Sequence, residues 1–379
     1  MKKFFGYIGD YCKTTDYWLI LLSLCCSGLG VVLLMGIAGD GYIGRGKIIT
    51  QAAATCAGLL AAIILSKIDY RFIAKMWKLH VPLALFLVIL TFTPLGKQVK
   101  ESVDDRAWLE IFGIGLQPSE FFKISFIMSF AYHLSLVKDD LNSTKNILLL
   151  CAHGAVPVLL IHFQGDDGSA LIFAFIFILM LFAAGIAWKY IIMAFGAVVI
   201  AIPVIWFGGI MNNDQKMRFL AIFHQDDPQF KDIFYQQYHG NISIGSGGVW
   251  GKGIFHVEHR FVPEMQNDFI FSFAGEAIGF IGCISIIALL AAVCLKILHN
   301  SRRCPDALGQ NICVGVFAML ASQSIINVGM NLSVIPVIGV TLPYFSAGGS
   351  SVLSTYMGVG LALSVYMFNT KGLFADNIG

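Results

Sequence analysis

A succession of long apolar stretches constrains the fold of this chain more than any other feature. A helix needs about 20 predominantly apolar residues to cross the hydrocarbon core of a bilayer. The sequence contains ten such stretches, at residues 17–37, 49–66, 77–95, 118–135, 147–163, 169–186, 189–208, 269–297, 310–331 and 345–368. Charged residues make up only 13% of the chain, against about 25% in soluble proteins. We therefore predict an all-α polytopic membrane protein with about ten transmembrane helices.

The distribution of lysine and arginine predicts the orientation of these helices, because cytoplasmic segments carry an excess of both residues. With the N-terminus in the cytoplasm, the inner segments hold fourteen of them: Lys2, Lys3, Lys13, Lys67, Arg71, Lys75, Lys78, Lys138, Lys145, Lys189, Lys296, Arg302, Arg303 and Lys371. The short outer loops hold five: Arg45, Lys47, Lys97, Lys100 and Arg106. This bias predicts that both termini are cytoplasmic.

One connecting segment is much longer than the others. Residues 209–268 join the seventh and eighth stretches and are polar, with interspersed aromatic residues such as Phe219, Tyr235 and Trp250. Loops this long are usually functional or disordered, and the aromatic residues argue against disorder. We predict a large extracellular loop that packs on the outer face and shapes a site. The remainder contains no soluble domain, so residues 1–379 are interpreted as a single transmembrane domain.

The segment QPSEFFK, residues 117–123, places two ionisable residues at the start of the fourth stretch. Pro118 suits the first turn of a helix. Glu120 and Lys123 are three residues apart, so a helix places them on one face. Ionisable groups at membrane depth are expensive and indicate function. Two interpretations are open: a substrate contact, or an ion pair that holds two membrane helices together.

The segment FQGDDGSAL, residues 163–171, places Asp166 and Asp167 between two apolar stretches. Aspartate often caps the helix that follows a tight turn. We interpret one of these two residues as such a cap.

Acidic residues are also concentrated where the long loop re-enters the membrane. Glu264, Asp268 and Glu276 follow one another at spacings of four and eight residues, so a helix would place them on one face. A partly desolvated carboxylate such as that of Asp268 is a better base than one in water. The alternative role for Asp268 is a cap at the entry of the eighth helix.

Glycines are frequent just before this acidic segment, in IGSGGVWGKG, residues 244–253. The Lys-Ser/Thr ending of a phosphate-binding loop is missing. We therefore predict that these glycines allow a tight backbone turn at the membrane surface.

Amide side chains form a stripe on the ninth stretch. Gln323, Asn327 and Asn331 recur every four residues, which is the spacing of one helix face. The segment after them, residues 335–351, has two prolines and a glycine pair, which are typical of a broken or re-entrant segment that lines a cavity. Hydrogen bonding between helices is the alternative role for the stripe.

Several classes of function have no support in the sequence. The net charge is +2, so no nucleic-acid partner is indicated. Most of the nine cysteines lie inside apolar stretches, which is typical of small buried residues. We find no histidine or cysteine spacing that indicates a metal site.

Taken in order, these motifs resemble those of the SEDS family (shape, elongation, division and sporulation proteins), which includes RodA, FtsW and SpoVE. The most specific pieces are QPSEFFK, IGSGGVWGKG, the PE-DFIF block with its trailing GE, and NVGM followed by IPVIGVTLPYFSAGGSS. The resemblance covers nearly the whole chain, and the form of the glycine segment is more similar to the elongation (RodA) branch. Departures from the family pattern, such as Asn267, Asp167 and Ala347, indicate a divergent member.

The resemblance implies a peptidoglycan glycosyltransferase of the bacterial cytoplasmic membrane, active in cell elongation or division. Such a protein polymerises lipid II into β-1,4 glycan strands and works with a class B penicillin-binding protein. It implies that Asp268 is the catalytic base and that Glu120 and Lys123 bind substrate. Lys123, with Arg106, would support the charge of the pyrophosphate, and Mg²⁺ or Mn²⁺ could share that task. Glu264 and Ser350, which belong to the matching blocks, are further candidates for substrate binding.

Two other functions remain open. The polar stripe and the broken segment after it would also suit a transporter or lipid II flippase. A catalytically degenerate family member that only scaffolds its penicillin-binding partner is the other alternative.

Overall fold

The computed structural model describes residues 11, 13–97, 106–111, 114–209, 211, 213–225, 227–255 and 258–375. Residues 1–10 lie outside this part of the chain, and the cytoplasmic location of the N-terminus stays a prediction. Ten helices correspond to the ten apolar stretches: α2 (Tyr17–Gly39), α3 (Arg45–Ser66), α5 (Trp77–Leu90), α6 (Pro118–Leu136), α7 (Thr144–Phe163), α8 (Asp167–Ala183), α9 (Trp188–Phe207), α12 (Ile270–Arg303), α13 (Ala307–Asn331) and α14 (Gly349–Ala375).

Not all ten helices are long enough and apolar enough to cross a membrane. Within the described residues, seven of them meet both conditions: α2, α3, α7, α9, α12, α13 and α14. Helices α5 and α8 are apolar but shorter, and α6 carries Glu120 and Lys123. The predicted polytopic all-α fold is therefore confirmed, whereas the count of ten spans stays a prediction.

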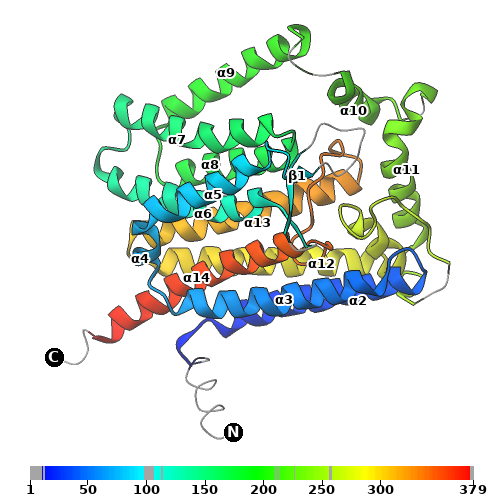
Figure 1. The fold of residues 1–379 in the computed structure, drawn as a ribbon, viewed down its shortest axis with the longest axis horizontal. Coiled ribbons are helices and arrows are strands. Elements are labelled where there is room, and N and C mark those ends of the chain that lie inside the picture. The colour runs from blue at the N-terminus through cyan, green and yellow to red at the C-terminus, as the bar shows by residue number, and fades with distance from the viewer. Residues whose placement is uncertain are drawn as a thin grey trace, which may run out of the picture.

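The helices form one bundle around α13, which packs against α6, α8, α12 and α14. The start of α2 and the end of α14 lie at one end of this bundle, and the helices of the long loop lie at the other (Figure 1). Helix α9 runs along the edge of the view (Figure 1), and none of its side chains is buried in the protein. A helix that is apolar all round and unburied in protein needs lipid as its solvent.

Short elements connect the long helices. They are α4 (Tyr70–Lys75), η1 (Lys138–Asp140), α10 (Asn213–Phe223), η2 (Pro228–Phe230), α11 (Lys231–Ser246) and the strands β1 (Gly96–Lys97), β2 (Trp108–Ile111) and β3 (Ile114–Leu116). The strands form a small antiparallel sheet in the order β1-β2-β3, an exception to the predicted all-α fold. β3 leads directly into Gln117 and Pro118, the first residues of the QPSEFFK segment.

Helix α12 is interrupted, and the glycine-rich segment supplies hydrogen-bond partners to its backbone on both sides of the break. Gly279 has a φ of 67° inside α12, a conformation that glycine adopts without strain. On one side of the break, the N–H of Phe280 donates to the carbonyl of Gly248 at 2.9 Å. On the other side, the carbonyl of Glu276 accepts from the N–H of Lys252 at 2.9 Å. The predicted glycine turn is present, and it also supplies the partners that a broken membrane helix needs.

Small residues let α3 and α14 pack closely. A Cβ added to Gly360 would lie 2.7 Å from the Cα of Ala62. Close approach through glycine is typical of helix pairs in membranes. The α3–α14 contact therefore depends on the absence of a side chain at this position.

We expect Gly360→Ala to lower the thermal stability of the purified protein, because overpacking typically costs about 1–3 kcal/mol. Gly28→Ala in α2 is the matched control, since no atom lies within 4 Å of its added Cβ. Melting temperatures in detergent measure both variants. Equal melting temperatures would show that the α3–α14 contact adapts without cost.

Candidate functional site

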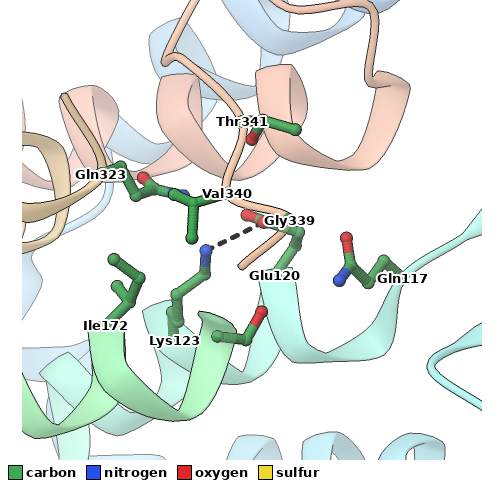
Figure 2. A pocket seen from close by; sticks show the side chains of 9 residues that line it. Gln117, Glu120, Lys123, Ile172, Gln323, Gly339, Val340 and Thr341 are labelled. Atoms are coloured by element: carbon green, nitrogen blue, oxygen red, sulfur yellow. Dashed lines mark hydrogen bonds and ion pairs between the residues drawn. The ribbon is translucent and has the colours of Figure 1, made fainter. Parts of the chain in front are cut away.

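A small polar pocket, partly open to solvent, lies between α6, α8, α13 and the irregular segment 332–348 (Figure 2). Its lining brings three of the sequence motifs together: Gln117, Glu120, Lys123, Ser169, Ile172, Gln323, Gly339, Val340 and Thr341. The segment after the amide stripe is therefore non-helical and lines a cavity, as predicted.

Lys123 and Glu120 form a buried ion pair in this pocket. The Nζ of Lys123 lies 2.8 Å from Oε1 of Glu120, and the residues are 1% and 4% exposed. The Oγ of Ser354, on α14, donates to Oε2 of Glu120 at 2.6 Å. Within the described residues, the ammonium makes one hydrogen bond, although it has three donors. The pair links α6 to α14 through Ser354 and also faces the pocket, so it has the contacts that both interpretations require.

Asp166 caps α8, which confirms the cap interpretation for one aspartate of the pair. Its Oδ1 accepts from the N–H of Ser169 at 2.9 Å, and its Oδ2 accepts from Nε2 of Gln117 at 2.9 Å. Burial raises the pKa of the Asp166 carboxyl above its usual value, and these bonds and the Lys123 ammonium offset only part of that rise. Asp166 therefore joins the starts of α6 and α8 at the pocket.

Asp268 lies in the turn before α12 and is half-buried. Its backbone carbonyl accepts from Nδ2 of Asn327 at 2.9 Å and from Nδ2 of Asn331 at 2.8 Å. Asn327 also donates to the carbonyl of Val340, a pocket residue, at 2.7 Å. The Oδ2 of Asp268 is 4.0 Å from the position of a Cβ on Gly339, which lines the pocket. The amide stripe thus places Asp268 at the pocket edge, a role that the sequence did not indicate.

The expectation that one helix carries Glu264, Asp268 and Glu276 on a single face is wrong. Helix α12 begins at Ile270, so two of the three residues precede it. Glu264 has a φ of 59°, and its Oε2 accepts from Nδ2 of Asn267 at 2.8 Å within the turn. The spacing misled because this local turn, rather than a helical one, joins Glu264 to Asp268.

Glu276 is fully buried in α12 and forms an ion pair with Lys252 of the glycine-rich segment. Its Oε1 lies 2.6 Å from Nζ of Lys252, and its Oε2 accepts from Oγ of Ser243 at 2.7 Å. These contacts fix the segment that fills the break in α12.

The other candidate residues do not belong to the lining of the pocket. The Oγ of Ser350 accepts from the N–H of Gln117 at 3.1 Å, so this residue supports the start of α6. Arg106 is exposed, and its N–H donates to the carbonyl of Gln164 at 3.4 Å. Their proposed contacts with substrate stay predictions.

The chain is similar to a family of known proteins over most of its length. Residues 16–371 match the family model described as cell cycle protein, FtsW/RodA/SpoVE. The "Probable peptidoglycan glycosyltransferase FtsW" of Geobacter metallireducens is 31% identical over 372 residues, which cover 92% of this chain and 94% of the relative. The "Peptidoglycan glycosyltransferase MrdB" of Escherichia coli is 28% identical over 317 residues, or 82% of each chain.

Two solved structures are similar in fold. One comes from work on the coordination of polymerization and crosslinking by a peptidoglycan synthase complex. It has a TM-score of 0.79 at 24% identity and covers 94% of this chain and 98% of that chain. The other is the rod shape determining protein RodA of Thermus thermophilus, with a TM-score of 0.68 at 24% identity and coverage of 94% and 97%. These similarities support the polytopic membrane fold.

We expect Lys123→Met alone and Glu120→Gln alone to destabilise the protein strongly, because each leaves an uncompensated charge or polar group in a buried site. Breaking a buried pair typically costs about 3–5 kcal/mol. The double variant should recover much of this loss. Melting temperatures of the wild type and the three variants form a double-mutant cycle. Additive losses would show that the two side chains do not depend on each other.

Proposed function

Because the chain belongs to the FtsW/RodA/SpoVE family of cell cycle proteins, we propose that it is a peptidoglycan glycosyltransferase that polymerises lipid II. The names of its relatives support the activity. The observation that carries the proposal is the position of Asp268 beside Gly339, in the wall of the pocket that holds Lys123. This arrangement puts a carboxylate and a cation at one polar pocket, as transfer from a diphosphate donor requires.

In the proposed reaction, a hydroxyl oxygen of the acceptor sugar attacks the anomeric carbon of the lipid-linked donor. The carboxylate of Asp268 takes the hydroxyl proton. The bond between the anomeric carbon and the diphosphate oxygen breaks, and the lipid diphosphate leaves with the electron pair. Direct displacement inverts the anomeric carbon, which converts an α-linked donor into a β-linked product.

Lys123 is the group that we assign to the leaving diphosphate. A cation at a developing phosphate charge stabilises the transition state, and in a buried site the effect is stronger than in water. Within the described residues, no cluster of three or more His, Cys, Asp or Glu side chains could hold a metal ion. That Mg²⁺ or Mn²⁺ shares this charge stays a prediction, because Mg²⁺ is usually held by one or two carboxylates together with substrate phosphates.

The proposal extends to location and partner. The chain is a multi-pass membrane protein, and we infer that its membrane is the bacterial cytoplasmic membrane, with the pocket near the outer face. We further infer that it works with a class B penicillin-binding protein, because a structure of similar fold comes from a peptidoglycan synthase complex. A lipid II transbilayer assay, run beside the polymerisation assay, separates this function from that of a flippase.

We expect Asp268→Asn to lower polymerisation of lipid II by about 10²–10⁴-fold, the usual contribution of a general base, without a comparable loss of stability. Asp232→Asn, an exposed aspartate on α11, should keep wild-type activity. Glycan strands made by purified protein with a co-expressed partner provide the measurement. Unchanged activity of the Asp268 variant would remove Asp268 from the mechanism.

A charge swap tests whether Lys123 acts on substrate. We expect the double variant Glu120→Lys with Lys123→Glu to remain inactive, because it places a carboxylate where the diphosphate needs a cation. If the pair only joins helices, the swap should restore the activity that either single change removes. Melting temperature shows in parallel whether the swapped protein is folded.

A further inference from the structure

Helix α10, in the long outer segment, connects the two walls of the pocket. The Nε2 of Gln215 donates to Oδ2 of Asp167 at 2.5 Å, and Asp167 begins the helix whose Ser169 lines the pocket. The Nη1 of Arg218 donates to the carbonyl of Val337 at 3.4 Å. Val337 is two residues before Gly339, which lines the opposite wall. In Figure 1, α10 lies at the end of the bundle away from the end of α14.

The lining of the pocket has no net positive charge with which to bind an anionic ligand. Lys123 is the cation among the lining residues, and Glu120 already neutralises it. The carboxyl groups of Asp166 and Asp268 lie beside the lining residues Gln117 and Gly339. A diphosphate that joins two organic groups carries a negative charge on each phosphate. The paired Lys123 offers such a ligand no net positive charge, so a further cation close to the pocket would strengthen its binding.

Arg218 has the position and the chemistry to supply that cation. Its side chain is exposed, and its bond to Val337 uses one of five guanidinium donors. Arginine binds phosphate oxygens through two parallel hydrogen bonds. Arg260, the other arginine of the outer segment, donates instead to Nδ1 of His239 at 3.1 Å.

We propose that Arg218 binds the diphosphate of the lipid-linked substrate at the mouth of the pocket and that α10 holds it there. The proposal rests on the proposed function for the identity of the substrate. The guanidinium contacts the phosphate oxygens from the outer side, while Lys123 faces them from inside the pocket. Gln215 fixes the position of α10 against α8.

The test measures binding as well as turnover. The probes are a polyprenyl diphosphate and the corresponding uncharged polyprenol, each titrated into the full-length purified protein. We expect Arg218→Gln to weaken diphosphate binding by about tenfold to a hundredfold, the usual range for a lost charged hydrogen bond. Polyprenol binding and the melting temperature should not change. Arg218→Lys should recover part of the affinity, because it keeps the charge but not the paired hydrogen bonds.

Arg260→Gln is the matched control, since it makes the same change to an exposed arginine of the same segment and should leave diphosphate binding unaltered. In the polymerisation assay, Arg218→Gln should raise the KM for lipid II more than it lowers kcat. If Arg218→Gln binds the polyprenyl diphosphate as tightly as wild type, the proposal is wrong. If wild type binds the diphosphate through Arg218 but makes no polymer, the proposed function fails and the binding site stands.

Discussion

The hydrocarbon of a membrane offers no water to the peptide backbone, so every interruption of a helix at that depth needs a partner within the protein. Two interruptions determine the architecture at the pocket. The backbone groups at the break in α12, beside Gly279, are hydrogen-bonded by residues 248–253. The irregular segment after α13 is tied by Asn327, which donates to the carbonyls of Val340 and Asp268. The site therefore lies where the bundle departs from regular helix, and amide side chains make that departure possible.

The polar groups of the pocket form hydrogen bonds to one another, and these bonds offset the cost of burying them. Glu120 accepts hydrogen bonds from Lys123 and Ser354, which come from two helices. Asp166 uses one carboxylate oxygen to cap α8 and the other to hold Gln117. Buried charges are costly unless they are paired and hydrogen-bonded. The groups that hold the helix starts together are thus the same groups that make the pocket polar.

Much of the fold could be predicted from composition and spacing, because the length and hydropathy of a segment identify a membrane helix. The cap at Asp166 and the position of Glu120 and Lys123 on one helix followed from local rules in the same way. The eighth stretch was predicted to begin at residue 269, one residue before the start of α12 at Ile270. The spacing of the acidic residues nevertheless suggested one helix face, because it could not show that Glu264 stays in a turn through a positive φ and a contact with Asn267. Nor could it place Asn331 against Asp268, because that contact joins residues far apart in the chain.

The order of the segments in the chain determines when the site is completed during synthesis. Residues 248–253 precede α12 in the chain, so the hydrogen-bond partners for its broken backbone are present when that helix enters the membrane. The amides that hold the carbonyl of Asp268 arrive later, with α13, and the pocket wall at Gly339 follows them. A ribosome that has not yet finished α13 therefore carries a protein with most of its helices and no assembled pocket. The pocket is therefore assembled only when insertion into the membrane is nearly complete.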